Sequence, residues 1–233
     1  MPTLTQLQKE LQQLADPKQQ EILQRFFKTG KGEYGEGDKF IGIKVPVQRK
    51  VAKKYQALSL TDIQTLLNSD IHEYRLTALI LLINHYTKAN DTNKQKIFDF
   101  YLHNTKHINN WDLVDITAPK IVGDYLLDKP RDILYQLARS TNLWEKRIAI
   151  IATMTFIKQD DFSDTLKLAE ILLNDEHDLI HKAVGWTLRE VGKREQSVEE
   201  NFLNKHYKQM PRTMLRYAIE RFDDKRRKFY LKK

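Results

Sequence analysis

The chain has 233 residues, and 39 lysines and arginines against 31 acidic residues give it a formal net charge of +8. It contains no cysteine, which excludes disulfide bonds, thiolate metal sites and cysteine nucleophiles. The longest aliphatic run, residues 78–83, is far too short for a membrane span, and the N-terminal segment lacks the pattern of an export signal. We therefore expect a cytoplasmic globular protein, with a polyanion as a possible partner and solubility as the alternative reason for the charge.

Helical spacing of apolar residues runs through nearly the whole chain, and no sustained segment alternates with the period of two that strands require. This pattern predicts an all-α protein. Asp16 before Pro17 predicts a helix start, because aspartate caps the first amides and proline suits the first helical position. Thr61 is a second candidate cap, and residues 128–130 (Asp-Lys-Pro) predict the opening of another helix.

One stretch breaks the helical pattern. Residues 29–42 contain five of the eight glycines, and residues 30–35 satisfy the pattern G-x-G-x-x-G. A dinucleotide site is disfavoured, because the pattern follows a helix rather than a strand and because Glu33, Glu36 and Asp38 would repel a pyrophosphate. We interpret these residues as a loop, here called the glycine-rich loop.

Two segments, residues 72–86 and 143–157, are apolar nearly all round and are predicted to be buried inner helices. Basic residues precede apolar positions at intervals of 72, 35 and 34 residues, at Arg75, Arg147, Lys182 and Arg216. A repeat near 35 residues in a helical chain is typical of stacked antiparallel helix pairs of the HEAT or tetratricopeptide kind. We expect a curved solenoid forming a single domain over residues 1–233, with the four basic residues in one surface stripe. The alternative is that each basic residue only solvates its own helix.

Trp111 and Asp115 lie four residues apart, so a helix places an indole and a carboxylate on one face. Pro119 removes the amide that would bond the Asp115 carbonyl, which predicts a kink or a helix end there. The simpler interpretation is that Asp115 complements a helix dipole and that Trp111 packs in a core.

Trp186 shares a helical face with Lys182 and Arg189, and an indole flanked by cations can pack against a nucleoside. Trp144, the third tryptophan, is expected to pack in the interior.

Metal chemistry has little support. Two histidine pairs have ligand-like spacing, His103 with His107 and His177 with His181, but neither has an evident third ligand. The sequence also lacks the G-x-S-x-G pattern of a serine nucleophile. We predict no metal site and no serine nucleophile.

Three segments together resemble the successive motifs of the HEAT-like DNA alkylation repair family, of the alkylpurine DNA glycosylase D type. They are residues 110–115 with Pro119, residues 143–149 and residues 182–190. The resemblance implies a helical solenoid whose concave face holds duplex DNA, and removal of N3- and N7-alkylated purines by a monomer without a cofactor. It implies that Asp115 is the catalytic carboxylate, that Arg147 is its partner at the DNA backbone, and that Trp111 and Trp186 flank the damaged nucleotide.

The resemblance extends to further DNA contacts. Basic residues on the concave face would hold phosphates, namely Arg75, Lys182, Arg189 and Arg216. Better understood members of the family carry an N-terminal tyrosine near the DNA, for which this chain offers Phe26, Phe27 or Tyr34.

Two alternatives to a glycosylase follow from the same residues. The first is a DNA-binding module of this fold that recognises distorted or branched DNA without breaking a bond, and the second is a scaffold for acidic peptides. The cationic stretch of residues 225–228 is a solvated last helix in one interpretation and a grip on flanking DNA backbone in the other.

Overall fold

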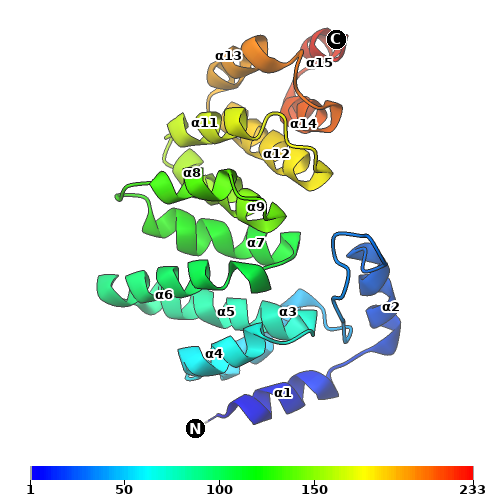
Figure 1. The fold of residues 1–233 in the computed structure, drawn as a ribbon, viewed down its shortest axis with the longest axis vertical. Coiled ribbons are helices and arrows are strands. Elements are labelled where there is room, and N and C mark those ends of the chain that lie inside the picture. Colours follow the sequence, from blue (N-terminus) through cyan, green and yellow to red (C-terminus); the bar gives the residue numbers. More distant parts are fainter. Residues whose placement is uncertain (1, 233) are drawn as a thin grey trace. The chain divides into compact units, whose positions relative to one another are not determined.

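The computed structural model describes residues 2–232, which form helices joined by turns (Figure 1). Among these residues the extended backbone pairs at one isolated parallel bridge, between Lys39 and Ile71. The prediction of an all-α fold is confirmed. The chain divides into two compact units, Met1–Leu113 (unit 1) and Val114–Lys233 (unit 2), while the single domain stays a prediction.

Unit 1 is built around one buried helix, α5, which packs against α3, α4 and α6. Its side chains are buried on almost every face, as the apolar pattern of residues 72–86 predicts. The helices of this unit are α1 (Leu4–Gln13), α2 (Pro17–Phe26), α3 (Val45–Lys54), α4 (Leu60–Leu67), α5 (His72–Lys88), α6 (Asp91–His103), the 3-10 helix η1 (Thr105–His107) and the start of α7 (Trp111–Ala118).

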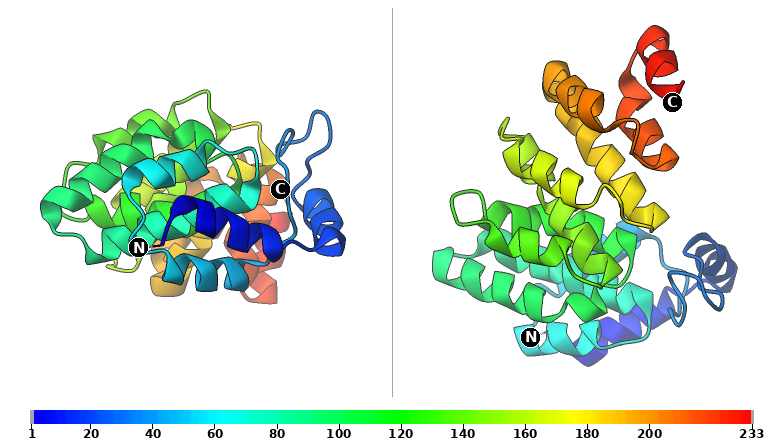
Figure 2. Two further views of the ribbon diagram at one scale, coloured as in Figure 1. Left: turned by 90° about the horizontal axis from the view of Figure 1, so that it is seen from below. Right: turned by 45° about the horizontal axis from the view of Figure 1, so that its top comes forward.

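In unit 2 the long helix α12 packs against α9, α11, α13 and α14 (Figure 2). Gly185 permits the close approach of α14, since a Cβ atom there would lie 2.4 Å from the Met214 carbonyl oxygen. After α7 this unit contains the π-helix η2 (Pro119–Gly123), α8 (Asp132–Ala138), α9 (Leu143–Ala152), α10 (Met154–Ile157), α11 (Ser163–Ile171), α12 (Asp178–Arg194), α13 (Gln196–His206), α14 (Arg212–Ala218), the 3-10 helix η3 (Ile219–Arg221) and α15 (Asp224–Leu231).

Helix α7 ends where Pro119 predicts. The α-helical winding stops at Ala118, and the chain continues as a single π-helical segment to Gly123. Thr155 donates a hydrogen bond to the Pro119 carbonyl at 2.6 Å, which satisfies one backbone group of the altered winding. π-helical turns are rare and often mark functional sites, because they change the direction of the side chains on either side.

Some predicted boundaries are confirmed and others are wrong. Asp16 caps α2 with Pro17 at its first position, as expected. The cap of α4 is Ser59 rather than Thr61, because Ser59 and Asp62 bond each other's amides and place Thr61 inside the helix. Helix α8 begins at Asp132, two residues after Pro130.

The predicted helix over residues 143–157 is two helices, α9 and α10. The break is at Thr153, whose hydroxyl donates to the Ile150 carbonyl at 2.7 Å. Such a local side-chain bond competes with regular helix geometry, and residue spacing alone does not reveal it. None of the helices within residues 2–232 combines the length and apolar character that a bilayer span requires.

Candidate active site

Asp115 on α7 and Arg147 on α9 form a two-point ion pair in unit 2. Arg147 Nε donates to Asp115 Oδ1 and Arg147 Nη2 donates to Asp115 Oδ2, both at 2.8 Å. The arginine side chain is 6% exposed and the aspartate side chain 15% exposed. The parallel bonds hold the carboxylate in one orientation, and the guanidinium balances its charge.

The third nitrogen of the Arg147 guanidinium, Nη1, donates to the Leu179 carbonyl at 2.6 Å. Leu179 lies in the first turn of α12, so Arg147 links α7, α9 and α12. Arg147 therefore lies in the interior, where it positions Asp115, rather than on an exposed stripe as its repeat position predicts. The buried guanidinium requires the counter-charge of Asp115.

Trp186 is half-buried on α12, and its indole N–H donates to Glu190 Oε1 at 3.1 Å. The two cations on its helical face each have an acidic partner. Lys182 pairs with Asp178 at 2.6 Å, and Arg189 contacts both Glu220 and Glu190. These pairs reduce the positive charge that the sequence assigns to this face.

The two remaining basic residues of the predicted stripe differ. Arg216 on α14 is exposed. Arg75 on α5 is buried, 4% exposed at its side chain, and its Nη2 donates to the equally buried Asp38 at 2.7 Å. Arg75 thus lies not on a surface but inside unit 1, where it forms an ion pair with the buried Asp38.

Trp111, in unit 1, is surrounded by the three aromatic residues that the sequence offered as N-terminal candidates. Its ring stacks on Phe27 at 5.2 Å and meets Phe26 edge-on at 5.9 Å, and its indole N–H donates to the Tyr34 hydroxyl at 3.2 Å. Phe26 is 61% exposed, while Phe27 is buried. The tryptophan is therefore part of an aromatic cluster that reaches the surface.

Beneath this cluster lies a charged network that sequence reasoning missed. His72 Nδ1 contacts Asp38 Oδ2 at 3.2 Å, and His72 Nε2 contacts Asp112 Oδ2 at 2.8 Å. Asn109 and Asn110 also donate to Asp38, each at 3.3 Å. Asp112 belongs to the motif that carries Trp111. Nothing in the sequence connects it with His72 and Asp38, which precede it by 40 and 74 positions.

The end of the glycine-rich loop is held by the buried carboxylate of Glu73. Its oxygens accept hydrogen bonds from the amides of Ile41, Gly42 and Ile43 at 2.8–3.2 Å. Gly42 is required here, because its φ is +88° and a Cβ atom would lie 2.1 Å from the Asp16 carbonyl oxygen. The loop is thus ordered by buried charge.

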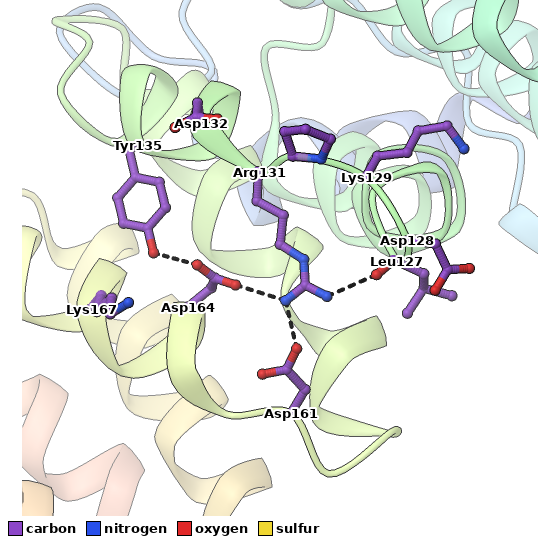
Figure 3. Close-up of a pocket in the computed structure, with 10 residues that line it drawn as sticks. Leu127, Asp128, Lys129, Arg131, Asp132, Tyr135, Asp161, Asp164 and Lys167 are labelled. Carbon is purple, nitrogen blue, oxygen red and sulfur yellow. Dashed lines mark hydrogen bonds and ion pairs between the residues drawn. The ribbon is translucent and has the colours of Figure 1, made fainter.

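An open pocket of about 720 Å³ lies between the α7–α8 connection and α11 (Figure 3). Arg131 fills its centre, donating to Asp161 and Asp164 at 2.6 and 2.7 Å and to the Leu127 carbonyl at 2.9 Å. Tyr135 also donates to Asp164. The charged groups at the centre of the pocket bind one another. Their bonds join neighbouring helices, and the pocket shows no evident chemistry for binding a ligand.

The histidine pairs have structural contacts. His177 Nδ1 accepts a hydrogen bond from the Leu179 amide as the cap of α12, and His103 contacts the Asp99 carbonyl within α6. Within residues 2–232, no cluster of three or more acidic and histidine side chains is arranged to hold a metal ion.

Two solved structures share the fold. One is described as a predicted DNA alkylation repair enzyme from Enterococcus faecalis; it is 16% identical, with a TM-score of 0.73, over 90% of this chain and 97% of that chain. The other is the protein smu.31 from Streptococcus mutans UA159, 16% identical with a TM-score of 0.55, over 95% of this chain and 98% of that chain. At this identity the likeness establishes the fold alone.

No curated protein matches the chain. The family model of the DNA alkylation repair enzymes matches residues 7–222, which include all the motif residues described above. A role in the repair of alkylated DNA follows from this match. The chain belongs to the DNA alkylation repair enzyme family.

Proposed function

We propose that the protein is a DNA glycosylase that hydrolyses the N-glycosidic bond of N3- and N7-alkylated purines in duplex DNA. The observation that carries this proposal is the two-point pair between Arg147 and Asp115. It holds a partly exposed carboxylate in one orientation on α7 beside a positive charge, in a family whose members are named for the repair of alkylated DNA.

The chemistry needs one such carboxylate. A purine alkylated at N3 or N7 is cationic, so it leaves with the electrons of the C1′–N9 bond as a neutral base, without prior protonation. The sugar left behind has oxocarbenium character, which a fixed negative charge stabilises. Arg147 bonds both oxygens of the Asp115 carboxylate and fixes its orientation. In this proposal the carboxylate orients the water that attacks C1′ and accepts its proton.

In this proposal, Trp111 and Trp186 flank the damaged nucleotide, and their ring faces favour the positive charge on its sugar and base. Arg147 acts on the substrate through Asp115, because its donors are engaged inside the protein. Arg216, and to a smaller extent Lys182 and Arg189, contact phosphates. Arg75 has no such role, because it is buried beside Asp38. The reaction needs no cofactor, and one copy of the chain is sufficient for it.

The test is release of 7-methylguanine or 3-methyladenine from methylated duplex DNA. Asp115→Asn keeps the shape of the side chain and removes its charge, so we expect release to fall on the order of 10²-fold or more while affinity for the duplex is retained. Asp132→Asn is the matched control, because Asp132 is an exposed acid in the first turn of α8. Equal release by wild-type protein and Asp115→Asn would remove Asp115 from the mechanism.

The same assay separates the proposal from its alternatives. Wild-type protein that binds duplex DNA but releases no base would be a non-catalytic DNA-binding module. A scaffold for acidic peptides would bind DNA weakly, whereas several phosphate contacts require affinity to fall steeply with salt, with a log-log slope of about −0.9 per contact.

A further inference from the structure

His72 occupies an unusual place in unit 1. It is the first residue of α5, its side chain is 2% exposed, and each of its two ring nitrogens faces a different carboxylate. Asp38 comes from the glycine-rich loop and Asp112 from the first turn of α7. The imidazole ring also stacks on Phe40 at 4.5 Å and contacts Phe27 at 5.1 Å, which restricts its rotation.

This geometry requires a charged imidazole. A neutral imidazole has one N–H, so it can donate to one carboxylate while its other nitrogen turns a lone pair toward the second. Only the imidazolium donates at both nitrogens. With His72 protonated, two cations, His72 and Arg75, balance the two carboxylates Asp38 and Asp112. A neutral His72 would leave one buried negative charge in excess.

Two connections join the glycine-rich loop to the start of α7. The first is the network from Asp38 through His72 to Asp112. The second is the hydrogen bond from the Trp111 indole to Tyr34 in the same loop. Asp112 and Trp111 are adjacent in the chain, so the network and the indole bond support the same turn of α7.

We infer that His72 is a positioning residue: as an imidazolium it fastens the glycine-rich loop to the first turn of α7 and thereby fixes the place of Trp111. Any effect of His72 on base release rests on the proposed function, but the connection between the glycine-rich loop and α7 does not. Deprotonation of His72 releases the glycine-rich loop from α7, and this breaks the contact between Tyr34 and Trp111.

The pKa of His72 supports this role. Burial lowers the pKa, but the charge of Asp112 and the hydrogen bonds to Asp112 and Asp38 outweigh burial and the repulsion by Arg75, and raise it to about 9. A histidine whose pKa is raised in the folded state contributes stability that is fully present below about pH 6.5. That stability is lost as the pH rises through about 9.

The first experiment uses the wild-type protein without DNA. Nitrogen NMR of the His72 ring at neutral pH should report protons on both nitrogens, and the Trp111 indole signal should shift as the pH rises through about 9. Amide exchange at Gly35 and Asp38, whose amides donate to the Lys28 and Gly35 carbonyls, should accelerate at least about tenfold over the same range after correction for intrinsic rates. A neutral His72 near pH 7, or a loop whose exchange follows the intrinsic rates alone, overturns the inference.

The second experiment compares His72→Gln with His103→Gln. His103 is exposed on α6, so its substitution controls for loss of a histidine. We expect His72→Gln alone to shift the Trp111 indole signal and accelerate loop exchange near neutral pH, with the Trp186 signal unchanged. An unaltered Trp111 signal in folded His72→Gln contradicts the inference. If His72→Gln does not fold, the wild-type pH series still decides.

These readouts separate the two proposals. Loop release without any glycosylase activity leaves the positioning role intact and removes only the proposed function. Base release by a protein whose loop exchange is unchanged leaves the proposed function intact and removes the positioning role of His72.

Discussion

Both units contain an arginine at the equivalent repeat position that binds an aspartate distant in sequence. In unit 1, Arg75 binds Asp38, and both side chains are 4% exposed. In unit 2, Arg147 binds Asp115, and the aspartate side chain is 15% exposed. Asp38 is also contacted by His72, Asn109 and Asn110, whereas Arg147 bonds both oxygens of Asp115 in parallel.

The difference between the two pairs is one of access to solvent. Asp38 is enclosed by donors, so it serves to order the glycine-rich loop. Asp115 is bonded at both oxygens by Arg147 and keeps contact with solvent. A similar pairing of arginine and aspartate is thus enclosed in one unit and reaches solvent in the other.

The largest expected effect comes from breaking the enclosed pair. Asp38→Asn leaves only Asp112 to balance the two buried cations Arg75 and His72, and should lower the free energy of unfolding by about 3–5 kcal/mol. Asp115→Asn should cost clearly less stability, because its site reaches solvent. Urea unfolding near neutral pH, followed by circular dichroism, measures both. Equal losses would remove the distinction between the two pairs.

Buried acids of the two units should also respond to pH in opposite directions. Contacts with His72 and Arg75 outweigh burial and lower the pKa of Asp38, so its stabilisation is present above about pH 4 and lost as the pH falls. Burial raises the pKa of Glu199 on α13 to about 9, which the charge of Glu200 reinforces. The folded state therefore loses stability as the pH rises from about 4.5 toward 9.

Glu199→Gln should remove this loss, because glutamine is neutral throughout. Near pH 7 the variant should be more stable than wild type by about 3 kcal/mol, with little gain near pH 4.5. Urea unfolding at the two pH values measures the difference. A gain that does not depend on pH would mean that the carboxyl of Glu199 is already ionised in the folded protein.

A smaller effect should show how the loop of unit 1 is held. Gly42 and Gly37 have nearly the same φ, +88° and +87°, but a Cβ atom at Gly42 would meet backbone while one at Gly37 would meet nothing within 4 Å. Gly37→Ala should cost about 1 kcal/mol through backbone strain, and Gly42→Ala more than about 2 kcal/mol. Thermal unfolding measures both. Equal losses of stability in the two variants would show that backbone strain, and not the close approach to Asp16, determines the loss.

Much of the fold could be predicted from local patterns. The spacing of apolar residues predicted helices throughout and the burial of α5, and Asp16 with Pro17 predicted the start of α2. Pro119 predicted the end of α7, because a missing amide has the same consequence in any surroundings. The caps and breaks at Ser59 and Thr153 depend on bonds with neighbours that several residues could make, and were not predicted.

The candidate site was predicted in part. Asp115 and Arg147 were named together, and they are in contact. The repeat pattern predicted an exposed stripe, yet Arg75 and Arg147 are buried, because periodicity assigns a residue to a helix face without saying which acid lies opposite. No local pattern pointed to His72, whose partners lie 34 and 40 positions away.

By itself, the sequence determined the helices, the repeat spacing, the excess of positive charge and the motif with Trp111 and Asp115, since each depends on residues close together in the chain. Only the tertiary structure decided which charges are neutralised, which carboxylate stays accessible and how the glycine-rich loop is fastened. Electrostatic energy depends on distance and burial, and both arise only when segments far apart in the chain pack together.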